Sequence, residues 1–175
     1  MRTKITTAAL GGLLAILAFS ACSMGGNATG EAAPPANTAE PAAGDSGFSA
    51  FGETWEYEDG LAVSVAAPEP YTPGQYAAGA DQANNIKLTF TVTNGTDEVF
   101  DLAALPDVTS GGVAGQSITD MEDPTVMSFG GTASVLPGQS FSWAEAFSIS
   151  DPADLTVAIS PAPFAYDKAI FTNAQ

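Results

Sequence analysis

The strict alternation of apolar and polar residues between positions 86 and 93 is the feature that most constrains the fold of this chain. Ile86, Leu88, Phe90 and Val92 alternate with a lysine and three threonines. Successive side chains of a β-strand point to opposite faces of the sheet, so a period of two predicts a strand with one buried face. This segment therefore predicts an antiparallel sheet that covers a core on one side only.

The same period of two recurs in three other segments. Residues 61–65 and 155–159 alternate apolar residues with Ala, Ser or Thr, and residues 141–149 carry large apolar residues on one parity, interrupted by a single glutamate. No stretch after the first 47 residues has the apolar spacing of an amphipathic helix. Short strands without helices predict an all-β protein, an antiparallel β-sandwich, with Trp55 and Trp143 in its core.

Turn residues separate these segments. Asn94-Gly95 follows the strongest strand and precedes Val99-Phe100, which predicts a β-hairpin turn. Pro137-Gly138 stands before the segment that begins at Phe141, and Asp151-Pro152 ends that segment. Proline and glycine at these places interrupt strand pairing, so the turns agree with the strand boundaries.

Two long stretches, residues 67–85 and 106–127, show no strand alternation. Loops of this length in a compact domain are usually functional or disordered. Tyr71 and Tyr76 lie in the first stretch among three prolines, and they are the candidate binding residues because exposed tyrosines can stack on sugars or grip a protein. The preferred alternative is that they fold back over a sheet edge, since an open sandwich must protect its edges.

Carboxylates gather in the second stretch. Asp120, Glu122 and Asp123 are candidate calcium ligands, because calcium prefers hard oxygen donors. Their spacing matches no known calcium loop, and a solvated acidic loop is the alternative. The expected result is therefore no resident metal and no cofactor, with these three residues as the calcium candidates.

The N-terminus has the pattern of a bacterial lipoprotein. Arg2 and Lys4 precede an apolar stretch of twelve residues, Ala8 to Phe19, too few to span a bilayer as a helix, which predicts a secretory signal peptide over residues 1–21. The sequence Phe19-Ser20-Ala21-Cys22 resembles a lipobox, in which the cysteine is acylated, for example with palmitate, and becomes the mature N-terminus. Cys22 is the single cysteine of the chain, and two acyl chains anchor a protein stably where one does not.

A flexible linker is expected between this anchor and the folded domain. Residues 22–47 include fifteen Gly, Ala or Pro and no Val, Ile, Leu or aromatic residue. Such a segment buries too little apolar surface to offset the entropy of ordering it. The single β-sandwich domain is expected over residues 48–175.

Charge and the absence of histidine exclude several functions. After Cys22 the chain has two basic residues and 20 acidic ones, which gives side chains a net charge of −18 and disfavours binding to nucleic acid. The chain contains no histidine, which removes Ser-His-Asp and Cys-His catalysis and most zinc sites. We therefore expect no enzyme, although a hydrolase that uses two carboxylates stays open.

The strand and turn sequences together resemble a known family. The matching pieces run from Gly52 to Val65, from Leu88 to Thr96, from Leu136 to Gln139 and through Phe147 to Leu155-Thr156-Val157. They are similar to the Ig-like extracellular domains of uncharacterised function found on lipoproteins of Gram-positive, mainly actinobacterial, species. These domains are related in fold to a secreted mycobacterial immunoprotective antigen. The resemblance implies an Ig-like β-sandwich and a lipoprotein context, with no catalytic residues to transfer.

These observations together predict an uncharacterised lipoprotein held at the extracytoplasmic face of the cell membrane by lipid on Cys22. Its Ig-like domain is expected to bind an envelope protein or a cell-wall component without catalysing a reaction. The alternatives are a structural or antigenic envelope component without a specific ligand, and the carboxylate-dependent hydrolase.

Overall fold

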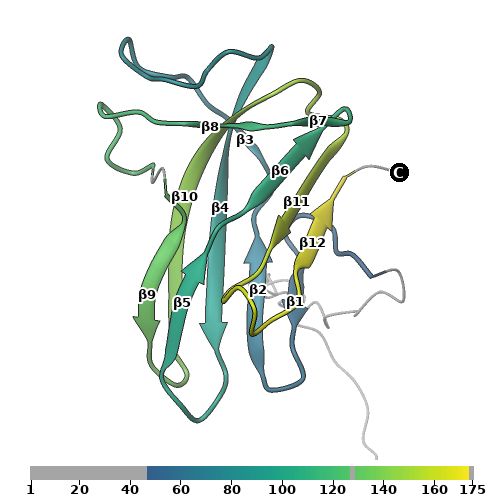
Figure 1. Ribbon diagram of the computed structural model, residues 1–175, viewed down its shortest axis with the longest axis vertical. Helices are drawn as coiled ribbons and strands as arrows, with labels where there is room; N and C mark the ends of the chain where they lie inside the picture. Colours follow the sequence, from purple (N-terminus) through teal and green to yellow (C-terminus); the bar gives the residue numbers. More distant parts are fainter. Residues whose placement is uncertain (1–46, 127–128, 174–175) are drawn as a thin grey trace, which may run out of the picture. The chain divides into compact units, whose positions relative to one another are not determined.

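A computed structural model describes residues 47–126 and 129–173 (Figure 1). The predicted signal peptide, Cys22 and nearly all of the predicted linker lie outside the described residues. Within the described ranges every regular element is a β-strand. These ranges contain no helix long and apolar enough to cross a bilayer. The strands are β1 (Thr54–Glu56), β2 (Leu61–Val65), β3 (Glu69–Pro70), β4 (Asn84–Asn94), β5 (Phe100–Ala104), β6 (Asp107–Ser110), β7 (Val113–Ala114), β8 (Gln116–Ile118), β9 (Gly131–Val135), β10 (Ser140–Ile149), β11 (Leu155–Ile159) and β12 (Ala169–Thr172).

The strands form an antiparallel sandwich of two layers. One layer is a sheet in the order β1-β2-β4-β10-β8, with β3 also paired to β4. The other consists of the sheet β12-β11-β6-β7 and the pair β5-β9. Figure 1 shows β6 continuing the line of β5, and Pro106, which has no N–H to donate, stands at the break between them. The Ig-like antiparallel β-sandwich that the sequence predicts is therefore confirmed.

The alternating residues meet in one core between the layers. Phe90 stacks on Trp143 with ring centroids 5.2 Å apart, at the centre of the long β4–β10 pair. Trp143 is buried in the core, as predicted, whereas Trp55 is only partly buried and packs on its margin. The residues buried around this pair are Leu61, Val63, Val65, Ile86, Leu88, Val92, Leu102, Ala104, Val108, Val135, Phe147, Ile149, Leu155, Val157, Ile159, Ala169 and Phe171.

The hairpin predicted at Asn94-Gly95 is wrong. Strand β4 pairs with β2, β3 and β10, whereas β5 pairs with β9 in the other layer, so the chain crosses between the layers here. The physical reason is the Asn94 side chain, which is fully buried. Its amide nitrogen donates to the carbonyl oxygens of Glu98 and Val135, each at 2.8 Å, and its oxygen accepts the N–H and hydroxyl of Thr96. Asn94 therefore ties the end of β4 to β9 across the sandwich.

The prediction that residues 106–127 lack strands is also wrong. This stretch contains β6, β7 and β8, which are four, two and three residues long. Strands this short do not produce a recognisable period of two, and they are held by pairing with β11 and β10 rather than by their own sequence. The breaks at Pro137-Gly138 and Asp151-Pro152 are confirmed, because β9, β10 and β11 begin and end around them.

Candidate functional site

The structure brings together the two loops that the sequence singled out separately. The Tyr71 hydroxyl donates to an Asp120 carboxylate oxygen at 2.8 Å, and the Gly74 N–H donates to the same oxygen at 2.7 Å. The Gln75 N–H donates to Glu122 at 2.8 Å. We call this contact between residues 71–76 and 120–122 the loop junction. It fixes both loops over the end of the β8–β10 edge.

Tyr71 and Asp120 serve this junction as structural residues. Hydrogen bonds from the Gly74 N–H and the Tyr71 hydroxyl hold the pKa of Asp120 below its usual range, and its side chain is only 6 % exposed. Burial, together with Asp120, raises the pKa of Tyr71. The Tyr71 ring packs against a small cluster around Ile118. The expectation that the tyrosines fold back over the sheet therefore describes Tyr71, whereas Tyr76 is 74 % exposed.

The carboxylates proposed for calcium are directed at protein donors. Asp120 and Glu122 accept the backbone N–H groups of the loop junction. Asp123 accepts the N–H and the hydroxyl of Thr125 at 2.9 and 2.6 Å. Within residues 47–126 and 129–173, no group of three or more His, Cys, Asp or Glu side chains is arranged to hold a metal ion. Calcium binding stays a prediction that no contact in the structure favours.

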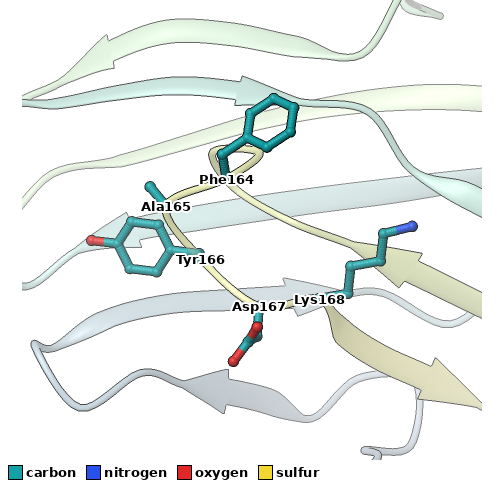
Figure 2. A pocket seen from close by; sticks show the side chains of 5 residues that line it. All are labelled: Phe164, Ala165, Tyr166, Asp167 and Lys168. Atoms are coloured by element: carbon teal, nitrogen blue, oxygen red, sulfur yellow. The ribbon is translucent and has the colours of Figure 1, made fainter.

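A second candidate surface lies on the β11–β12 loop, residues 160–168. A shallow pocket of about 340 Å³ is lined by Phe164, Ala165, Tyr166, Asp167 and Lys168 (Figure 2). Phe164 has a backbone φ of +73°, in the left-handed region that a bulky residue adopts at a cost on the order of 1 kcal/mol. Its side chain is fully exposed. The loop therefore holds an aromatic ring in water in a conformation that is unfavourable for phenylalanine.

Hydrogen bonds make this loop rigid. The N–H groups of Ala165 and Tyr166 both donate to the carbonyl of Ala162 at 3.1 Å, and the Ser160 hydroxyl donates to the carbonyl of Tyr166 at 2.9 Å. The Tyr166 ring lies 5.6 Å from Phe100 in an edge-to-face contact. In Figure 2 the Tyr166 and Lys168 side chains point in opposite directions from the loop. Tyr166 thus anchors the loop on the sandwich and leaves Phe164 free to contact another molecule.

A neighbouring pocket of about 310 Å³ shares three residues with the first. It is lined by Tyr57, Glu58, Asp59, Ala165, Tyr166 and Asp167. The Tyr166 hydroxyl donates to Asp59 at 2.5 Å, and the Tyr57 hydroxyl donates to the Asp167 carbonyl at 2.8 Å. The hydrogen bond from Tyr166 lowers the pKa of Asp59, and the same bond, together with burial, raises the pKa of Tyr166 to about 12.

Sequence reasoning did not identify this surface. The segment Pro161-Ala-Pro-Phe-Ala-Tyr166 has no strand period, and a phenylalanine that follows two prolines looks like any loop residue. Tyr57 and Tyr166 are 109 positions apart, so only the fold brings them together. The one available signal was an aromatic pair in a short proline-rich connection between two strands.

A buried carboxylate lies elsewhere, on β10. Glu145 is 3 % exposed and accepts the indole N–H of Trp143 at 2.8 Å. Burial raises its pKa, although hydrogen bonds from Trp143 and the Gly130 N–H act in the opposite direction. Glu145 lines neither pocket on the β11–β12 loop. It is therefore not placed to act with the pocket carboxylates as an acid–base pair.

Glu145 makes the stability of the domain depend on pH. Because its pKa is raised in the folded state, the folded protein binds more protons than the unfolded one between the unfolded and folded pKa values. Its contribution is fully present below the unfolded pKa, near 4.3, and is lost as pH rises through the folded pKa. We expect the free energy of unfolding of Glu145→Gln, measured by urea denaturation from pH 4 to pH 8, to rise relative to wild type as pH increases. A difference that is independent of pH would contradict this prediction.

The fold places the chain in the class of antiparallel β-sandwich domains. YjhA of Bacillus subtilis is 12 % identical, with 71 % of this chain and 99 % of that chain covered and a TM-score of 0.54. YcdA of the same species, a predicted lipoprotein, is 9 % identical over 68 % of this chain, with a TM-score of 0.55. The match covers only 37 % of YcdA.

The secreted protein MPT63 of Mycobacterium tuberculosis is 18 % identical, with 71 % of this chain and 95 % of that chain covered and a TM-score of 0.48. No family model matches the chain, and no curated protein matches it. The sequence suggested a resemblance to the β-sandwich domains of bacterial lipoproteins and secreted proteins. This resemblance is confirmed at the level of the fold.

Proposed function

We propose that this protein is a non-enzymatic binding module, anchored by lipid on Cys22 at the extracytoplasmic face of the membrane, that binds a protein of the cell envelope. The lipobox-like sequence supports the anchor, and the similarity in fold to YcdA, a predicted lipoprotein, agrees with a location outside the cytoplasm. A structural or antigenic component without a ligand is the alternative.

The observation that carries the binding role is Phe164. Aromatic residues that protrude from rigid loops dominate the binding energy of many protein interfaces, because they bury a large area and lose little conformational entropy. The loop fixes Phe164 in an unfavourable backbone conformation with its ring fully exposed. In the free protein the exposed ring buries no apolar area, whereas a partner that covers the ring would gain the apolar contact.

We expect Phe164→Ser to weaken binding to isolated Gram-positive cell envelopes at least about tenfold, as for an aromatic hot spot. The measurement is co-sedimentation of residues 22–175 carrying Cys22→Ser. Because Phe164 is exposed, its replacement should leave the melting temperature nearly unchanged.

The matched control is Tyr76→Ser, since Tyr76 is also an exposed aromatic but belongs to the loop junction. Its binding should stay within about twofold of wild type. Loss of binding in Tyr76→Ser with normal binding in Phe164→Ser would move the site to the loop junction. The absence of saturable binding by the wild-type protein would favour the structural alternative.

A further inference from the structure

The second pocket, which Phe164 does not line, has walls that the binding role of Phe164 does not explain. Tyr57, before the β1–β2 turn, and Tyr166 meet with ring centroids 5.0 Å apart and planes at 73°. Together with Ala165 they line a shallow, open hollow of about 310 Å³. Glu58, Asp59 and Asp167 complete its lining. The pocket is therefore an open aromatic corner beside two touching rings, with carboxylates around it.

The negative charge of this pocket is not neutralised by the cations of the described domain. Residues 47–126 and 129–173 include two basic side chains, Lys87 and Lys168. Lys87 pairs with Glu69 at 3.1 Å, and Lys168 pairs with Asp107. No lysine or arginine lines the pocket between the tyrosines. Its field therefore attracts a positive charge from another molecule.

The shape of the aromatic corner favours a small cation over a flat ring. Tyr166 makes edge-to-face contacts with both Tyr57 and Phe100, so the aromatic surface here is divided between steeply inclined rings rather than presented as one flat platform. An ammonium or guanidinium group needs only part of a ring face, and it gains from the ring quadrupole as well as from the carboxylates. Burial raises the pKa of Tyr57 to about 12, and the nearby carboxylates contribute, so both hydroxyls stay protonated and keep their hydrogen bonds at neutral pH.

We propose that the pocket between Tyr57 and Tyr166 binds the cationic end of a lysine or arginine side chain on the protein partner that Phe164 anchors. This inference rests on the proposed function. Ala165, Tyr166 and Asp167 line both the pocket beside Phe164 and this one, so one partner surface can cover the ring and place a cation beside it. The partner is then a basic protein, which complements the excess of acidic residues in this chain.

The test uses n-butylammonium chloride as a mimic of the lysine side chain, titrated into residues 22–175 carrying Cys22→Ser and followed by NMR. We expect saturable shifts of the Tyr57 and Tyr166 signals, and none with n-butanol, which has a similar shape without the charge. Glu58→Gln/Asp167→Asn removes two charges and keeps the shape, because Tyr57 bonds the backbone carbonyl of Asp167. This variant should weaken butylammonium binding at least about threefold.

The control is Asp81→Asn/Asp154→Asn, which removes the same charge from exposed loop positions, Asp154 being at the opposite end of β11. Equal weakening in both double variants, or equal shifts with n-butanol, would overturn the inference. Normal envelope binding by Glu58→Gln/Asp167→Asn would refute the cation pocket and leave the role of Phe164 intact. Butylammonium binding without any envelope binding would refute the proposed function and, with it, the lysine or arginine assignment.

Discussion

Replacing Asn94 with alanine is expected to lower the free energy of unfolding by about 3 kcal/mol. The side chain is fully buried and makes four hydrogen bonds, of which the bond to the Val135 carbonyl joins the two layers of the sandwich. Alanine removes all four and leaves the buried Val135 carbonyl without this donor, whereas the Glu98 carbonyl keeps the Thr96 hydroxyl at 3.2 Å. Each unsatisfied buried group costs about 1–3 kcal/mol. Urea denaturation of the mature chain measures this loss.

Asn84→Ala is the matched control for Asn94. Asn84 begins the same strand, and its amide donates to a single acceptor, the carbonyl of Ser150, at 3.0 Å in a partly exposed position. Its loss should cost about 1 kcal/mol. Equal effects of the two substitutions would mean that Asn94 does not hold the layers together, and that the crossing of the chain is set elsewhere.

Trp143→Ala is expected to lower the free energy of unfolding by about 4 kcal/mol, which is more than the loss expected for Asn94→Ala. The indole stacks on Phe90 at 5.2 Å and on Phe141 at 5.9 Å, and the backbone of Gly131 in β9 lies so close that a Cβ there would be 2.7 Å from the ring. Alanine leaves a cavity at the centre of the β4–β10 pair, and a rigid sheet cannot collapse to fill it.

Two further variants separate packing from hydrogen bonding at Trp143. Trp55→Ala, on the edge strand β1 and only partly buried, should cost about half as much. Trp143→Phe keeps most of the stack but removes the indole N–H that Glu145 accepts, so it should destabilise the protein more at pH 8 than at pH 4. Thermal and urea unfolding at both values measure this difference. A loss in Trp143→Ala no larger than that in Trp55→Ala would contradict the central role of this residue.

The sequence predicted those strands that are long enough to show the alternation of apolar and polar residues by themselves. Strands β2, β4 and β11 are five to eleven residues long and alternate between buried and partly exposed residues. Strand β10 shows the apolar parity in its sequence, although its last five residues, 145–149, are all buried. The short strands β6 to β8 could not be predicted in this way, because their pairing partners rather than their own residues determine them. Asn94-Gly95 misled the prediction because local turn preference is weaker than four buried hydrogen bonds made to residues beyond the turn.

For the candidate sites too, the sequence identified some of the residues, but only the fold showed which of them lie together. Tyr71 and Asp120 were each singled out from the sequence, but their pairing across 49 residues, which makes them structural, depended on the fold. Phe164 gave no signal beyond being aromatic, because its importance lies in a backbone angle and in exposure. The pocket between Tyr57 and Tyr166 has no counterpart in any contiguous segment.

By itself, the sequence determined that the domain is a sandwich of antiparallel strands, because the side-chain period of two is a local property that is visible within the residues of each strand. It also determined the acidic character and the absence of histidine chemistry, which composition alone fixes. The tertiary structure decided which strands are neighbours, which polar groups are buried and which loop residues share a pocket. These depend on contacts between residues that are distant along the chain, and such contacts are settled only when the two layers close over a common core.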